Sequence, residues 1–218
     1  MNGFFQRLSA VAFDAAMAPL ESLRLRRIRQ DLLSAAQGAV LEVGAGTGVN
    51  IAHYDPTRIE SLTMSDLDDR GLVITERVGR LQPELSDRVV VTRIDAQRLP
   101  FPDNTFDTVV ATLLFCSVEC QPCGFDEILR VLKPTGRYLF MEHVRPEHAA
   151  MATLFDVVNP VWKQISRGCN LNRDTVAELR QAGFEIEWST ADRNRVFTWG
   201  AARESRAITP DRRSSIPG

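Results

Sequence analysis

The feature that most constrains the fold is an apolar segment that runs directly into a cluster of glycines. Residues 39–43 read Ala-Val-Leu-Glu-Val, and Gly44, Gly46 and Gly48 follow at alternate positions. The apolar run predicts a buried strand, and the glycines let the backbone of the next turn approach a ligand closely. A helix that starts after such a turn offers free N–H groups to the ligand. The alternative interpretation is a tight turn with no ligand, as in any α/β protein.

The glycine spacing argues against a dinucleotide as the ligand. A dinucleotide fingerprint has glycine at its first, third and sixth positions, and the sixth position here is Val49. The carboxylate of Glu42 would also repel a pyrophosphate. A carboxylate there suits a ligand with a cationic amino group, and S-adenosylmethionine carries an ammonium and a sulfonium but no phosphate. The motif therefore favours S-adenosylmethionine.

Two further acids follow predicted strands at positions suited to a nucleoside. Asp66 ends the second strand, where an acid can accept both ribose hydroxyls, although Asp68 and Asp69 are close alternatives. Each of them could instead cap a helix. Asp95 follows the third strand, and its side chain and the N–H of Ala96 could recognise an adenine ring.

Strands and helices alternate along most of the chain. The predicted strands are 39–43, 61–65, 89–94, 108–114, 137–144, 184–188 and 196–200, and the helices are 1–36, 72–81, 126–132 and 175–182. This order predicts a doubly wound, parallel α/β sheet with helices on both faces. We expect one domain over residues 1–202, with a helical cap at 1–36. Residues 147–173 break the alternation as an insertion, and the polar segment 203–218 is predicted to be a disordered tail.

Composition narrows the classes of protein that remain. The chain has 218 residues, a net charge of −2 and a hydrophobic fraction of 44%, which is typical of a globular protein. The charge balance provides no global basic field for nucleic acid. No uncharged stretch approaches the ~18 residues of a membrane span, so we expect a cytoplasmic protein. The arginines at 24–29 indicate a solvated helical face or, alternatively, a weak peripheral contact with anionic lipid.

At this point the motifs resemble those of the class I S-adenosylmethionine-dependent methyltransferases, over about residues 8–200. The resemblance is carried by LEVGAGTG at 41–48, by Asp66, by DAQRLPFPDNTFDTVVATLLFCSV at 95–118 and by EILRVLKPTGRYLFMEHV at 127–144. It implies a Rossmann-like, seven-stranded sheet in the order 3-2-1-4-5-7-6, with the last strand antiparallel.

The resemblance also implies which residues hold the cofactor, at the carboxyl ends of the strands. These are Glu42, Gly44, Ala45, Gly46, Gly48, Asp66, Leu67, Asp95, Ala96, Thr112 and Leu113. Two features depart from the family pattern. Thr135 stands where a second glycine is usual, and the segment 119–125 is unlike the polar helix that we would expect there.

The segment NPVWKQISRGCNLNRDT at 159–175 resembles a narrower branch of methyltransferase-like proteins that act on alkyl thiols, with bacterial relatives labelled as phospholipid or quinone methyltransferases. We expect 147–173 to form a lid that, with the N-terminal helix, encloses an apolar acceptor. The candidate substrate residues are Phe13, Met17, Phe155 and Trp162. Ordinary helix cores are the alternative.

His143 is the candidate catalytic base, because it ends the fifth predicted strand on the rim where an acceptor would enter. Its alternative role is that of a polar residue in the pocket wall. Cys116, Cys120 and Cys123 have an iron–sulfur ligand spacing, but we interpret them as one buried cysteine and two loop thiols and expect no metal. A redox pair formed by Cys120 and Cys123 is a further alternative.

The predicted function is methyl transfer from S-adenosylmethionine to a small apolar acceptor, with a thiol or an amine favoured. Alternatives are a phospholipid or quinone methyltransferase at a membrane surface, a methyltransferase acting on protein or RNA, and a non-catalytic cofactor-binding protein. The sequence shows no basic–aromatic platform for nucleic acid.

Overall fold

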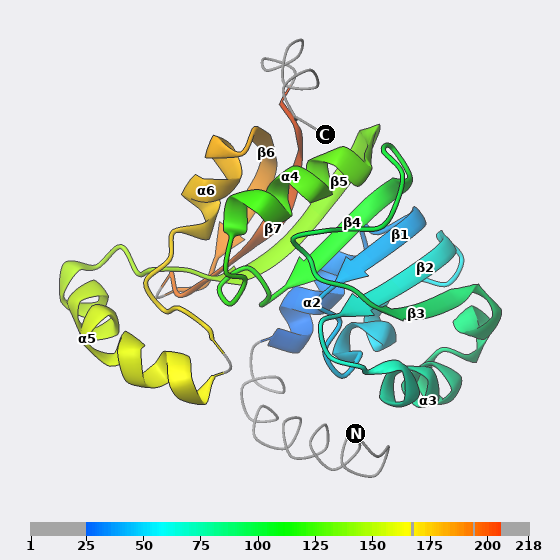
Figure 1. Cartoon of the computed structure of the whole chain (residues 1–218), viewed down its shortest axis with the longest axis horizontal. Helices are drawn as coiled ribbons and strands as arrows, with labels where there is room; N and C mark the ends of the chain where they lie inside the picture. The colour runs from blue at the N-terminus through cyan, green and yellow to red at the C-terminus, as the bar shows by residue number, and fades with distance from the viewer. Residues whose placement is uncertain (1–24, 167, 194, 206–218) are drawn as a thin grey trace.

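A computed structural model describes residues 25–166, 168–193 and 195–205. Its centre is a seven-stranded sheet in the order β3-β2-β1-β4-β5-β7-β6 (Figure 1). The strands are β1 (Gly38–Val43), β2 (Ile59–Asp66), β3 (Val89–Arg93), β4 (Phe106–Thr112), β5 (Leu132–His143), β6 (Phe184–Ala191) and β7 (Phe197–Glu204). Neighbouring strands from β3 to β5 are parallel, and β7 is antiparallel to both β5 and β6. The predicted strand order and antiparallel last strand are confirmed.

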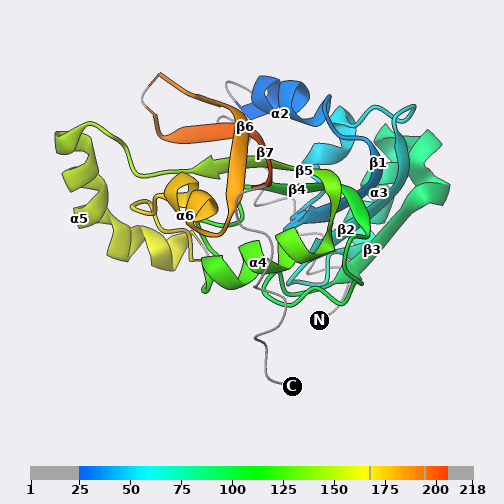
Figure 2. The same ribbon diagram turned by 90° about the horizontal axis from the view of Figure 1, so that it is seen from above.

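The central strands of the sheet are buried on both sides, so their side chains are apolar on both faces. Successive residues of a strand point to opposite faces, so Val40 and Leu41 enter different core clusters, as do Val110 and Val109. One cluster contains apolar residues of α2 (Arg26–Leu33), η2 (Val49–His53) and α3 (Gly71–Leu81). The other contains those of α4 (Gln121–Val131) and α6 (Thr175–Gln181). The sheet is therefore the middle of three layers (Figure 2).

The insertion contains a helix, α5 (Ala149–Ile165), which includes Pro160. Figures 1 and 2 both show α5 projecting away from the sheet rather than lying on one of its faces. Five of its apolar side chains are exposed: Leu154, Val157, Val158, Val161 and Trp162. No helix among the described residues is both long enough and apolar enough to cross a membrane.

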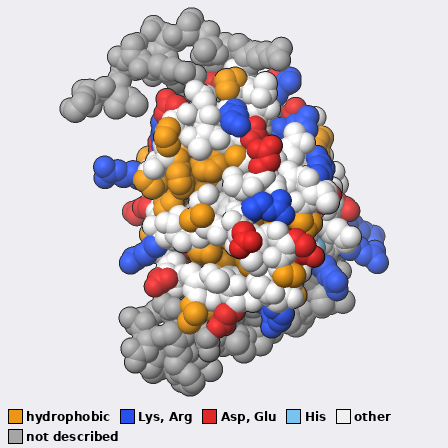
Figure 3. All heavy atoms as spheres, turned by 90° about the vertical axis from the view of Figure 1, so that its right-hand side faces the viewer, with side chains coloured by type: hydrophobic (Ala, Val, Ile, Leu, Met, Phe, Trp, Pro, Cys, Tyr) orange, Lys and Arg blue, Asp and Glu red, His pale blue; other side chains and the backbone are white. Residues whose placement is uncertain are grey.

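Surface charge on the face that holds β3 and α3 is mixed. Basic and acidic side chains are interspersed there among the described residues, with scattered apolar ones between them (Figure 3). This face consequently carries no continuous basic field of the kind that binds nucleic acid.

Several boundaries differ from the predicted ones, and β5, for example, begins at Leu132 instead of residue 137. Helix α4 begins at Gln121 instead of Asp126, because Cys120 acts as its N-cap and Pro122 falls in the first turn, where proline is tolerated. Arg203 and Glu204, assigned to the tail by composition, instead extend β7 and pair with β6. Residues 206–218 of the predicted tail and most of the predicted N-terminal cap lie outside the described residues. The 3-10 helix η3 (Pro83–Arg88) lies between α3 and β3 along the chain.

A substitution of Gly200 would show how closely β7 packs against β6. A Cβ atom there would lie 2.2 Å from the carbonyl oxygen of Trp188 and 2.9 Å from Cα of Ser189. Both are backbone atoms that cannot turn aside, so Gly200→Ala should destabilise the fold by about 1–3 kcal/mol or more. Gly79→Ala is the matched control: nothing lies within 4 Å of its Cβ position in α3, and it should stabilise by ~0.5–1 kcal/mol. Urea unfolding measures both, and equal effects would contradict the strand packing.

Candidate active site

The first turn of the site lies where β1 and β4 end side by side. Val43 is paired with Ala111, and the turn after Val43 has positive φ at Gly44, Gly46 and Gly48. A Cβ on Gly44 would lie 2.7 Å from the Leu114 side chain, whereas one on Gly46 would project into open space. The turn is thus packed on one side and open above Gly46, as a backbone that cradles a ligand requires.

Beneath this turn, a buried network of side chains joins four elements. Arg29 of α2 is only 4% exposed, and its Nη1 donates to Asn50 Oδ1 at 2.6 Å and to Thr112 Oγ1 at 2.8 Å. Asn50 Nδ2 donates to Glu42 Oε1 at 2.9 Å and to Thr112 Oγ1 at 3.0 Å. The hydroxyl of Tyr54 donates to Glu42 Oε2 at 2.7 Å. Both carboxylate oxygens of Glu42 are therefore held by groups of the chain itself.

Burial raises the pKa of Glu42 to about 7, and the hydrogen bonds from Tyr54 and Asn50 and the charge of Arg29 oppose the rise. A carboxyl group with this pKa changes its charge near neutral pH. Any positive charge placed next to it would favour its ionised form. The predicted contact between Glu42 and a cofactor ammonium stays a prediction.

Asp66 reaches across from the end of β2 to the glycine turn. Its Oδ2 accepts the N–H of Gly46 at 2.8 Å, and its Oδ1 accepts the N–H of Asp68 at 3.0 Å. Of the three neighbouring acids, Asp66 is therefore the one that contacts the turn. Leu67, directly after it, is 61% exposed, which leaves an apolar surface open at this edge of the sheet.

The predicted adenine contact lies further along the same edge. Asp95 is exposed and accepts hydrogen bonds from the N–H and the side-chain amide of Gln97, while Ala96 is buried. Gln97 in turn accepts the N–H of Cys120. Gln97 thus links Asp95 to Cys120, which directly precedes α4.

The turn after β4 is held from below by Glu142 of β5. Its carboxylate, fully buried, accepts the backbone N–H groups of Leu114, Phe115 and Cys116 at 3.0–3.3 Å. Leu113, just before them, has a φ of 57°, which is uncommon for a residue with a branched side chain. Burial raises the pKa of Glu142 to about 8, and the three N–H groups oppose the rise.

His143 and Phe155 come together although they lie on different elements. The ring of His143, at the end of β5, stacks on Phe155 of α5 with centroids 5.7 Å apart, and it also meets the edge of Phe197. Burial lowers the pKa of His143 to about 4, so its ring is neutral at neutral pH. Trp162 lies further along α5 and is 38% exposed. Phe13 and Met17 lie outside the described residues.

The cysteines differ from the interpretation as one buried cysteine and two loop thiols. Cys120 and Cys123 form a disulfide, since the N-cap and first turn of α4 bring their Cα atoms to 5.3 Å. The third, Cys116, is buried, and Cys169 lies close enough to its thiol to raise its pKa. Among the described residues, no three or more His, Cys, Asp or Glu side chains gather in a way that could hold a metal.

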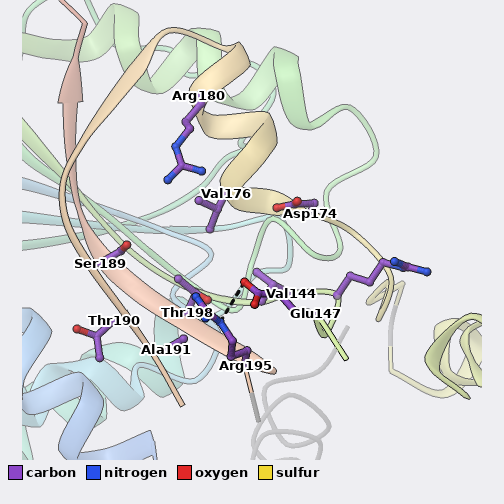
Figure 4. A pocket seen from close by; sticks show the side chains of 11 residues that line it. Val144, Glu147, Asp174, Val176, Arg180, Ser189, Thr190, Ala191, Arg195 and Thr198 are labelled. Carbon is purple, nitrogen blue, oxygen red and sulfur yellow. Dashed lines mark ion pairs between the residues drawn. The ribbon is translucent and has the colours of Figure 1, made fainter. Parts of the chain in front are cut away.

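A separate cavity of about 300 Å³ lies between α6 and the ends of β5, β6 and β7. Figure 4 shows Arg180 and Val176 reaching into it from α6, and Arg195 joined to Glu147 by an ion pair. Its lining includes Ser189 and Thr198 but none of the predicted site residues. The cavity is polar and does not coincide with the glycine turn at the ends of β1 and β4.

Arg29, Asn50 and Tyr54 were missed by the sequence analysis. Arg29 belongs to the arginine run at 24–29, which we assigned to a solvated or lipid-facing surface; its burial corrects that assignment for this residue. A signal was present, because Arg29 lies four residues from both Leu25 and Leu33 on the apolar stripe of the helix. Asn50 and Tyr54 carry no comparable signal.

These groups fit a cationic ligand without phosphates. The backbone of the open turn at Gly46 is bonded to the carboxylate of Asp66, and Glu42 lies buried at the end of the preceding strand. Two cations close to the turn are engaged by the chain itself: Arg29 by Asn50 and Thr112, and Arg77 by the carbonyl and the hydroxyl of Thr47. The exposed Leu67 offers an apolar surface to a flat ring. Acids, open backbone and apolar surface together match the ammonium, ribose and adenine of S-adenosylmethionine.

Comparisons with known proteins agree with this chemistry. Residues 41–140 match the methyltransferase domain family. Human thiol S-methyltransferase TMT1B is 31% identical, with 78% of this chain and 72% of that protein covered. Human thiol S-methyltransferase TMT1A is 35% identical, covering 67% of this chain and 59% of that protein, so the chain spans less than two thirds of it. The ubiquinone/menaquinone biosynthesis C-methyltransferase UbiE of Saccharophagus degradans is 33% identical over 54% of this chain and 47% of its own.

Solved structures show the same fold. An S-adenosylmethionine-dependent methyltransferase of Methanosarcina mazei has a TM-score of 0.62 at 17% identity, covering 82% of this chain and 97% of its own. The [4+2]-cyclase SpnF has a TM-score of 0.66 at 22% identity, covering 84% and 80%. The sheet order, the acid-bordered glycine turn and the human relative lead to one conclusion: the chain belongs to the class I S-adenosylmethionine-dependent methyltransferases.

Proposed function

We propose that this enzyme transfers the methyl group of S-adenosylmethionine to the sulfur of a small apolar thiol. The observation that carries the proposal is the environment of His143, which is neutral, buried and stacked on Phe155 at the end of β5. Two of the relatives are named thiol S-methyltransferases, which supports the same acceptor. After the sulfur of a thiol, the nitrogen of an amine is the next acceptor atom that we consider.

The cofactor would be held by the carboxyl ends of β1 to β4. We assign its methionine part to the turn at Gly44, Ala45, Gly46 and Gly48, with Glu42 beside the ammonium. Asp66 and Leu67 would contact the ribose and one face of the adenine, and Asp95 and Ala96 its ring edge. Thr112 and Leu113 would lie beneath the sulfonium. When bound, the cofactor supplies a methyl group on a positively charged sulfur, which leaves as a neutral thioether.

The choice of acceptor rests on proton transfer. A thiol has a pKa near ~8.5, so a fraction is already ionised at neutral pH, whereas alkylammonium and phenol groups need pH values near ~10. With a pKa of about 4, His143 is a weak base and suits an acceptor that needs little help in losing its proton. Attack on the sulfonium is then mainly a matter of positioning and excluding water.

Helix α5 would supply the acceptor side of the site. Phe155 already contacts His143, and Trp162 presents an exposed indole on the same helix. Apolar side chains of α5 would cover an apolar acceptor and keep water from the reacting sulfur. The N-terminal residues Phe13 and Met17 are assigned to the opposite wall.

A quinone C-methyltransferase is the second candidate. Relatives named UbiE match over half of the chain, and the apolar surface of α5 would also suit an isoprenoid ring compound. A carbon nucleophile on a phenol ring requires a stronger base than a neutral His143 with a lowered pKa. This requirement ranks the thiol first.

The acceptor is tested with a panel of alkyl thiols, alkylamines and a phenolic quinol, each assayed for methyl groups transferred from labelled S-adenosylmethionine. We expect the highest kcat/KM for an apolar thiol. Trp162→Ala should raise the KM for that thiol several-fold and leave the cofactor Kd unchanged, because the indole is assigned to the acceptor wall and has no assigned contact with the cofactor.

Lys163→Ala is the matched control for Trp162→Ala, since Lys163 is its exposed neighbour on α5 and has no assigned contact with the acceptor. The control should leave KM unchanged. Turnover of the quinol alone would replace the thiol proposal with the second candidate. A Trp162→Ala enzyme with the KM of the control would show that the acceptor lies elsewhere.

Glu42 predicts a pH dependence of cofactor binding. With a pKa of about 7, its ionised fraction rises as pH increases, and a cationic ligand binds the ionised form. The apparent affinity should therefore rise roughly eightfold between about pH 6 and pH 7.5, in proportion to that fraction. His143 titrates below this window, and Tyr54 above it because its pKa is raised by burial and by Glu42. Cys169, with a pKa of about 7, and Glu142, with a pKa of about 8, titrate in or near the window, so the difference between wild type and Glu42→Gln isolates the part that Glu42 contributes. Calorimetry on Glu42→Gln should give weaker binding with a flat profile; a flat wild-type profile would remove Glu42 from the cofactor site.

A further inference from the structure

The segment that follows α5 is fastened to the turn after β4. The backbone N–H and the side-chain amide of Asn170 both donate to the carbonyl of Cys116, at 2.8 and 3.0 Å, across 54 positions of sequence. Arg173 donates to the carbonyls of Phe115 and Val118 in the same turn. These bonds hold the segment that begins directly after Cys169 against the turn that contains Cys116.

The two cysteine side chains have unlike surroundings. Cys116 is 2% exposed, whereas Cys169 is only partly buried. The two thiols are close enough for each to shift the pKa of the other, and the side chains of Trp162 and Arg173 also act on Cys169. Cys116, Trp162 and Arg173 lower the pKa of the Cys169 thiol to about 7, while Cys169 and burial raise that of Cys116.

We propose that Cys116 and Cys169 form a dithiol site that reduces small disulfides, with Cys169 as the attacking thiolate and Cys116 as the resolving thiol. The geometry supports these roles: one sulfur is accessible and surrounded by donors, and the other is buried in contact with it. This activity is separate from methyl transfer and requires no cofactor. Its substrate class is a low-molecular-weight disulfide, R–S–S–R.

The reduction of the disulfide proceeds in two exchange steps. The Cys169 thiolate attacks one sulfur of the disulfide, which forms Cys169–S–S–R and releases the first thiolate, RS⁻. Cys116 then gives its proton to a released thiolate and attacks the Cys169 sulfur, which releases the second RS⁻. The second RS⁻ takes the proton that Cys169 lost on ionisation. The substrate is reduced to two thiols, and the protein is oxidised to a Cys116–Cys169 disulfide.

Cys120 and Cys123 need to be separated from this site because they lie close to Cys116 in sequence and are already joined. The double variant Cys120→Ser, Cys123→Ser leaves only Cys116 and Cys169. Serine at position 120 can also replace the N-cap of α4, so the helix should be retained. This full-length variant is the background for the experiment, with its melting temperature as the folding control.

The variant is incubated with 2-hydroxyethyl disulfide, alkylated and mapped by mass spectrometry under non-reducing conditions. We expect two equivalents of released thiol per chain and a cross-link between the peptides that contain Cys116 and Cys169. Adding Cys116→Ser should stop the reaction at a stable mixed disulfide on Cys169, with one equivalent released. Adding Cys169→Ser should abolish the release.

A conservative variant outside the cysteines adds a second measurement. Trp162→Phe retains the bulk of the ring but removes the indole N–H, so the first exchange step should slow several-fold while the cross-link still forms. An unreacted Cys169 in the background variant would overturn the proposal. So would a mixed disulfide that persists with Cys116 present, because the buried thiol would then not resolve it.

Discussion

The buried guanidinium of Arg29 is the interaction on which the site depends. A buried charge is tolerated only when it is paired and hydrogen-bonded. Arg29 donates to Asn50 and Thr112, and Asn50 in turn donates to Glu42. Arg29 lies on α2 and the other three residues lie on η2, β4 and β1, so the hydrogen bonds of one side chain fix how four elements meet. The glycine turn starts two residues after Glu42 and inherits that geometry.

The same network contains an acid that we assign to a cationic cofactor. Glu42 accepts hydrogen bonds from Asn50 and Tyr54, and with a pKa of about 7 it changes its charge near neutral pH. Asp66 adds a second carboxylate while bonding the backbone of the turn. On the other side of β4 from β1, β5 contributes two buried titratable groups with different uses. Glu142 holds the turn after β4, and His143 faces α5 as a neutral ring.

The strands β1 to β5 and the glycine turn could be predicted from sequence because both depend on local patterns: apolar runs define the strands, and the glycines mark a turn that must be open. The strand order and the antiparallel last strand are instead implied by the family resemblance. The helical spacing of Arg29 carries a signal of its burial, but its partners come from three other elements and could not be read from local sequence. The Cys116–Cys169 contact joins segments far apart in the chain, and the Cys120–Cys123 disulfide depends on where α4 begins. Such contacts require the tertiary structure.

We assign the glycine turn and its neighbouring acids to S-adenosylmethionine, a cation that carries no phosphate. Isothermal titration calorimetry tests this assignment, with S-adenosylmethionine and NAD⁺ titrated into the wild-type protein and into Gly46→Val, whose side chain would fill the open space above the turn. We expect micromolar binding of S-adenosylmethionine to the wild type only, and no binding of NAD⁺ to either protein. Equal affinity of a folded Gly46→Val protein for S-adenosylmethionine, or comparable binding of NAD⁺ to the wild type, would contradict it.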